Sequence, residues 1–186
     1  MKKIITLLLF AVTMSAFAED HLKFMGITID GSLPEFGTAL EKKGFEKSSI
    51  FHQSVYEGYF AGREAYVIPT GDPASLSIAG VAVYFKNNGT WKDMESTYQS
   101  IKDGLQIKYG DPIEVKEVGA APEYDVFISS RLKDETLVRR SIFINQLGMI
   151  TVAIIKSDEL YGVYPSVVYF DLINLGKVMQ KAQDDL

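Results

Sequence analysis

The sequence offers few residues that could do chemistry. It contains no cysteine and only two histidines, His21 and His52. The absence of cysteine excludes disulfides, thiolate metal sites, a cysteine nucleophile and a lipid anchor on cysteine. The two histidines lie far apart in the chain, and a single histidine within a strand is usually structural. We therefore predict no catalytic residue, no metal site and no cofactor.

Carboxylates are the remaining candidates for catalysis, because a pair of them can serve a glycosidase. The candidates are Glu57, Glu64, Asp125 and Asp171. The adjacent Arg139 and Arg140 would point to opposite faces of a strand, so they cannot form one anion clamp. A small envelope hydrolase that uses carboxylates, or a glycan-binding protein, is therefore the alternative function.

Aromatic side chains and an arginine are concentrated in one short stretch. Tyr56, Tyr59, Phe60 and Arg63 lie around two glycines that punctuate a predicted pair of strands. Tyrosine and arginine often anchor protein interfaces, and tyrosine also stacks on sugars. If the chain is extended here, Tyr59 and Phe60 point to opposite faces, so one of them is free for a ligand. We predict that these four residues bind a partner. The alternative is that they fill the core.

The composition is that of a globular protein. The chain has 186 residues, of which 47% are hydrophobic and 23% charged, and its formal net charge is −5. This length suits one domain. The acidic balance argues against binding to nucleic acid or to an anionic membrane, because both need a basic face. We expect an envelope or extracellular protein as the partner, with a glycan as the weaker alternative. The oligomeric state is left open.

The N-terminus has the three parts of a secretory signal peptide. Residues 1–3 are the basic segment, Ile4 to Val12 is the apolar run, and Ala16-Phe17-Ala18 is the cleavage site. The apolar run is too short to span a membrane, which takes about 20 residues. We predict that residues 1–18 are removed after Ala18 and that the protein is soluble and is periplasmic or secreted.

Two helices have clear signals in the sequence. Ser32 and Glu35 have the spacing of a capping box for a helix from about Leu33 to Lys43. Thr90 is the expected cap of a second helix, which Gly110 ends. The apolar residues of this second helix fall on one face and are expected to be buried: Trp91, Met94, Tyr98, Ile101 and Leu105.

Segments rich in β-branched and aromatic residues are the predicted strands. They are Phe45–Tyr56, Tyr59–Pro69, Leu76–Lys86, Ile113–Val118, Tyr124–Ser130, Thr136–Asn145, Met149–Lys156 and Val163–Leu172. The tail, residues 174–185, is expected to form a short helix.

A helix followed by strands thus occurs twice. We predict an α+β fold in which residues 19–186 form a single domain, with an antiparallel meandering sheet and the helices packed on one face. The alternatives are an internal duplication of residues 26–88 and 89–172 and a fold with two sheets side by side.

Three segments carry a resemblance to known proteins. They are residues 26–32 (GITIDGS), residues 91–112 with their ending KYGDP, and residues 169–171 (YFD). Together they resemble small, uncharacterised exported proteins of Gram-negative gut anaerobes. This family has no assigned activity, so the resemblance implies no catalytic residue. The order of elements also resembles the β-lactamase-inhibitor-protein fold and small outer-membrane assembly lipoproteins, although this chain lacks the inhibitor's disulfides and the lipoproteins' acceptor cysteine.

Overall fold

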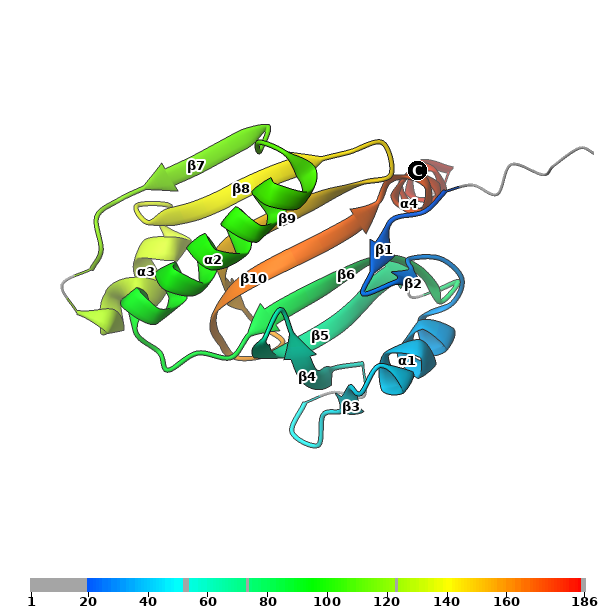
Figure 1. Cartoon of the computed structure of the whole chain (residues 1–186), viewed down its shortest axis with the longest axis horizontal. Helices are drawn as coiled ribbons and strands as arrows, with labels where there is room; N and C mark the ends of the chain where they lie inside the picture. The colour runs from blue at the N-terminus through cyan, green and yellow to red at the C-terminus, as the bar shows by residue number, and fades with distance from the viewer. Residues whose placement is uncertain (1–19, 52–53, 73, 123, 185–186) are drawn as a thin grey trace, which may run out of the picture.

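The protein is built around one antiparallel sheet. The computed structural model describes residues 20–51, 54–72, 74–122 and 124–184. Within them, eight strands pair in the order β3-β4-β5-β6-β10-β9-β8-β7, and every neighbouring pair is antiparallel (Figure 1). The strands are β3 (Glu46–Lys47), β4 (Tyr56–Phe60), β5 (Arg63–Asp72), β6 (Ser77–Phe85), β7 (Glu114–Val118), β8 (Val138–Ile144), β9 (Gly148–Ser157) and β10 (Gly162–Asp171). A separate hairpin joins β1 (Lys23–Phe24) and β2 (Ile27–Thr28). The predicted α+β class is confirmed.

The strand order runs from both edges towards the middle. The strands β3 to β6 follow one another in chain order from one edge, and β7 to β10 do so from the other. The two series meet where β6 pairs with β10. The described residues therefore form one large sheet rather than two sheets side by side. This order agrees with an internal duplication, which stays a prediction.

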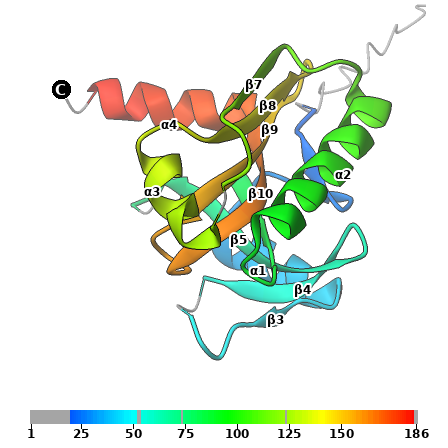
Figure 2. The same cartoon turned by 90° about the vertical axis from the view of Figure 1, so that its left-hand side faces the viewer.

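Four helices accompany the sheet: α1 (Leu33–Lys42), α2 (Trp91–Tyr109), α3 (Ile128–Lys133) and α4 (Leu172–Asp184). The capping box of α1 is present, with the Ser32 hydroxyl accepting from the Glu35 amide. Thr90 caps α2 in the same way through the Asp93 amide. Figure 2 shows α2 and α4 on opposite sides of the sheet, so the predicted packing of the helices on one face is not confirmed.

The main core lies between α2 and the sheet. All five residues of the predicted α2 stripe are buried, which confirms the helix and its orientation. They share one apolar cluster with Phe36 and Leu40 of α1 and with side chains from the central strands. A smaller cluster, which contains Ile68, Ala82 and Leu160, lies apart from the main one.

Two predicted strands are wrong. Among the described residues of Phe45–Tyr56, only residues 46–47 and Tyr56 are in strands, because the Ser48 hydroxyl accepts from the amides of Ile50 and Phe51 and turns the chain. Residues 125–133 form a 3₁₀ turn and α3 instead of a strand. Val126 and Phe127 are exposed in this segment, so their strand preference has no sheet in which to pack.

The predicted signal peptide lies outside the described residues, so its cleavage stays a prediction. In the described part of the chain, no helix has both the length and the apolar character needed to cross a membrane.

Candidate functional site

A groove of about 450 Å³ lies between α2 and the tips of two hairpins. We call it the α2–hairpin groove. The β1–β2 hairpin, the β4–β5 hairpin, α2 and β10 all contribute to it. Its lining residues are Lys23, Met25, Phe60, Ala61, Ser100, Ile101, Gly104, Leu105, Lys108 and Tyr169. Segments from distant parts of the chain therefore converge on one surface feature.

The floor of the groove is aromatic and apolar. The Phe60 ring stacks on Phe24 at a centroid distance of 5.1 Å and meets the edge of Tyr169 at 6.4 Å. Ile101 and Leu105 are buried members of the α2 stripe. Tyr169 is also buried, and burial raises the pKa of its hydroxyl, so it stays a neutral part of the floor. This floor offers apolar contact area rather than reactive groups.

The two hairpin tips have the same unusual backbone. Met25 (φ 51°) precedes Gly26 (φ 81°), and Ala61 (φ 50°) precedes Gly62 (φ 76°). Two positive φ angles in a two-residue loop are typical of the type I′ hairpin turn, which favours Asn, Asp or Gly at the first position. Methionine and alanine there cost about 1–2 kcal/mol each. Both strained residues line the groove, and strained backbone is often found at functional sites. Three other described residues with positive φ lie outside the groove: Leu76, Glu135 and Tyr161.

The rim of the groove is basic. Lys23 and Lys108 are exposed, and no aspartate or glutamate is among the described lining residues. The Lys108 ammonium lies 4.8 Å from the centre of the Tyr109 ring. The groove thus combines an apolar floor with positive charge, although the whole chain has a net charge of −5.

The four residues predicted from the sequence do not lie together at this groove. Phe60 is in the floor, whereas Tyr59 is 67% exposed and donates its hydroxyl hydrogen to Glu64. The two therefore differ in environment, as strand alternation requires. Tyr56 is buried against Gly37 of α1 and lines a second cleft, beside Pro34 and Leu76. Arg63 pairs opposite Phe60 at the start of β5. The predicted role of all four in binding a partner stays a prediction.

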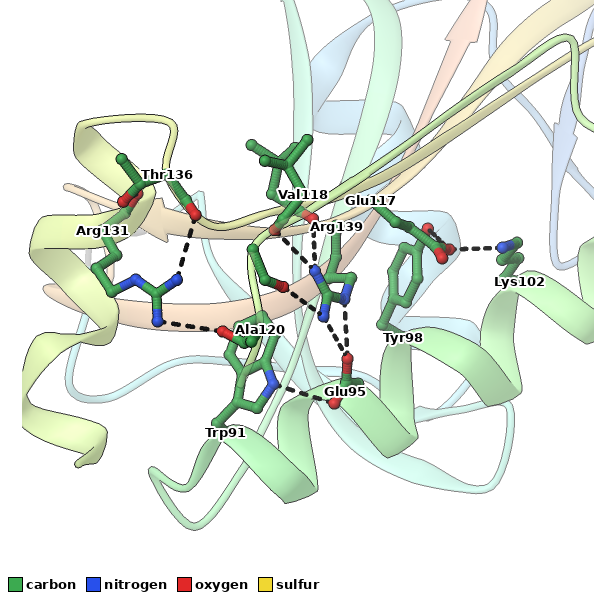
Figure 3. A network of polar contacts seen from close by, with 12 residues as sticks. Trp91, Glu95, Tyr98, Lys102, Glu117, Val118, Ala120, Arg131, Thr136 and Arg139 are labelled. Carbon is green, nitrogen blue, oxygen red and sulfur yellow. Dashed lines mark hydrogen bonds and ion pairs between the residues drawn. The ribbon is translucent and has the colours of Figure 1, made fainter. Parts of the chain in front are cut away.

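A network of ion pairs and hydrogen bonds holds α2 against the edge of the sheet (Figure 3). The Glu95 carboxylate accepts from the Trp91 indole at 3.0 Å and from the Arg139 guanidinium at 2.8 Å. Arg139 also donates to the backbone oxygens of Val118 and Gly119 and lies over the Trp91 ring. Its neighbour Arg140 instead pairs with Glu114, so the two arginines diverge as predicted.

A second part of the network lies one turn further along α2. The Tyr98 hydroxyl is 3.1 Å from a Glu117 oxygen and 2.7 Å from the Ser141 hydroxyl. Burial raises the pKa of Tyr98 to about 12. A hydrogen bond from Lys102 at 2.6 Å lowers the pKa of Glu117. Because these groups bind one another, the network positions α2 and leaves no carboxylate free for catalysis there.

Two of the candidate carboxylates of a hydrolase, Glu57 and Glu64, lie around one cation, Lys86, whereas Asp125 and Asp171 have different partners. Glu57 accepts from Ser48 and Lys86, Glu64 pairs with Lys86, and Asp125 accepts from the Trp91 amide. Asp171 is fully buried and binds His21. Every described carboxyl group with a shifted pKa is shifted downward: Asp30, Glu35, Glu57, Asp72, Glu117 and Glu135.

Only one of the two histidines, His21, lies among the described residues. His21 lies between Asp171 and Asp30, and His52 is outside the described residues. Among the described residues, no group of three or more histidine and carboxylate side chains could hold a metal ion.

Comparisons with protein-family models, curated proteins and solved structures found no match to this chain. The resemblance to exported proteins of gut anaerobes therefore stays a prediction.

Proposed function

We propose that this chain is an exported, non-enzymatic binding protein that holds a segment of another envelope or extracellular protein in the α2–hairpin groove. The observation that carries this proposal is the convergence of two strained hairpin tips and α2 on an open groove with an aromatic floor. Aromatic floors and flexible methionine side chains are common at binding surfaces. The strain at Met25 and Ala61 is explained if these residues contact the partner.

The electrostatics support binding over hydrolysis. A general acid needs a carboxyl group whose pKa is raised, usually inside a pocket. The shifted carboxyl groups of the described chain all have lowered pKa values, and none of them lines the groove. The surface that the structure offers is thus suited to contact rather than to proton transfer.

Gly104 permits a clean test of the groove. It is exposed on α2, and a Cβ atom placed on it would meet nothing within 4 Å. Gly104→Leu should therefore fill the groove without a clash, and it should strengthen the helix, because leucine favours helix over glycine by about 0.8 kcal/mol. Gly176 in α4 is equally open and serves as the matched control.

The experiment is affinity capture from envelope extract of the source organism, with each variant as bait and the retained proteins quantified by mass spectrometry. We expect a specific partner to be retained by the native protein and by Gly176→Leu and lost with Gly104→Leu, while neither variant lowers the melting temperature. Equal retention by all three baits would show that the groove is not the binding site. Intact mass of exported protein, with Glu19 as the expected first residue, tests the localisation.

A further inference from the structure

We infer that the groove recognises an acidic segment in which a bulky apolar side chain is flanked by carboxylates. This inference rests on the proposed function and names the chemistry of the partner. The apolar side chain would lie on the floor formed by Phe60, Leu105 and Tyr169. The carboxylates would meet Lys23 and Lys108 on the rim.

The charges around the groove favour an anionic partner. Among the described residues, neither Lys23 nor Lys108 forms an ion pair with a carboxylate. The two acids that flank Lys108 in the sequence are engaged with glutamines, since Asp103 accepts from Gln99 and Asp111 accepts from Gln106. The basic rim is thus not neutralised from within the described protein. Such a patch attracts acidic partners and disfavours basic ones.

A further lysine extends the basic rim behind the β1–β2 turn. The Lys43 ammonium would lie 3.9 Å from a Cβ atom placed on Gly26, at the tip of that hairpin. Lys43, Lys23 and Lys108 come from α1's C-terminal cap, β1 and the last turn of α2. Positive charge from three separate elements therefore surrounds the hairpin tip that carries Met25.

The shape of the groove favours a polypeptide over a fatty acid, the other apolar anion that this chemistry would accept. Most of its rim is exposed: Lys23, Met25, Ala61, Ser100, Gly104 and Lys108. An acyl chain needs a pocket that encloses most of its surface. An open groove instead suits one side chain of a partner whose backbone stays at the surface. Gly104 has no side chain, so the backbone of the partner can come close to α2 at this point.

The probes are fluorescein-labelled heptapeptides with a central phenylalanine flanked on each side by two glutamates, two glutamines or two lysines. A fourth peptide has alanine between the glutamates, and laurate serves as the fatty acid. Binding to the full purified protein is followed by fluorescence anisotropy, and laurate is tested as a competitor. We expect the glutamate–phenylalanine peptide to bind at least about fivefold more tightly than the other three peptides.

The variant pair is the double substitution Lys23→Gln and Lys108→Gln, with Lys92→Gln and Lys133→Gln as the control. Lys92 and Lys133 are exposed lysines away from the groove, so both double variants lose the same charge. We expect the groove variant to bind the glutamate–phenylalanine peptide about fivefold or more weakly than the native protein does, and its affinity should depend less on salt concentration. The control variant should bind the peptide as the native protein does.

The outcomes separate the two proposals. If the glutamine peptide binds as tightly as the glutamate peptide, the inference about acidic recognition is overturned and groove binding stands. If no peptide binds, or if laurate binds in its place, the inference is also overturned. Groove-dependent capture with Gly104→Leu against Gly176→Leu then decides the proposed function independently.

Discussion

The Nδ1 atom of His21 lies 3.0 Å from a carboxylate oxygen of Asp171, although 150 positions separate the two residues. Asp171 is fully buried and also accepts from the amides of Leu22 and Asn174, at 2.8 and 2.9 Å. Asn174 in turn donates to the backbone oxygen of Ile29. One carboxylate therefore holds the start of the described chain and the first turn of α4 against the end of the sheet.

Asp171→Ala should destabilise the protein by about 3–5 kcal/mol, because it leaves buried donors without their acceptor. The control is Asp158→Ala, since Asp158 is 95% exposed and its nearest ammonium is 3.7 Å away. The control should change the free energy of unfolding by under about 0.5 kcal/mol. Urea unfolding of both variants is the measurement. Equal, small effects would show that Asp171 does not hold the two segments together.

Leu105→Ala should cost about 2–5 kcal/mol, since Leu105 is 6% exposed within the α2 stripe. Ile107 lies two residues further along the same helix and is 88% exposed, so Ile107→Ala should cost under about 1 kcal/mol. Thermal unfolding followed by circular dichroism distinguishes the two. A loss under about 1 kcal/mol for Leu105→Ala would place the stripe in solvent.

The Glu117 network should make stability depend on pH in a defined direction. The Lys102 hydrogen bond keeps the pKa of Glu117 below its usual value of 4.5 in the folded protein. A lowered folded pKa stabilises the protein above about pH 4.5, and this contribution is lost as the pH falls through the folded pKa.

Glu117→Gln should therefore lower stability at pH 7, by under about 1 kcal/mol because the pair is partly exposed. The difference from the native protein should shrink towards pH 3, and Glu46→Gln, at an exposed position in β3, is the control. Denaturant titrations at both pH values test this. A difference that is constant with pH would mean that the Glu117 charge contributes nothing.

Relieving the backbone strain at the two hairpin tips should raise the stability of the protein and weaken its binding to the partner. Asparagine tolerates positive φ better than methionine or alanine, so Met25→Asn and Ala61→Asn should each raise stability by about 0.5–1 kcal/mol. Tyr161→Asn is the control, because Tyr161 has a φ of 51° and does not line the groove.

All three variants should raise the melting temperature, and only Met25→Asn and Ala61→Asn should weaken partner capture. If all three leave capture unchanged, the strain at the two tips has no part in binding.

The sequence predicted the elements whose signals are local. The Ser32–Glu35 capping box and the α2 stripe depend on residues within a few turns of one another, and the structure confirms both. The strand predicted at residues 124–130 is wrong because β-branched and aromatic residues favour a strand only where it can pack in a sheet. Here Asp125 instead accepts from the Trp91 amide, and Val126 stays in solvent.

The groove was only partly visible in the sequence. The concentration of aromatic residues in the sequence predicted a binding role for Phe60, which lines the groove. It predicted the same role for Tyr56, which is buried against α1. Nothing local connects Lys23, Gly104 and Lys108, since only the tertiary fold brings β1 beside α2. The sequence does contain one recognisable signal, the two-residue turns Met25-Gly26 and Ala61-Gly62. Such turns disfavour methionine and alanine at their first position.

Site-specific photo-cross-linking at Ser100 tests most directly whether the α2–hairpin groove binds a protein. Ser100 is exposed on the rim, so benzoylphenylalanine can replace it, and the same group at Tyr161, which is 88% exposed outside the groove, is the control. We predict that illumination of intact cells joins the Ser100 variant to one envelope or extracellular protein, through an acidic segment identified by mass spectrometry, and that the Tyr161 variant gives no such product. The same products from both positions, or none from Ser100, would contradict the proposal.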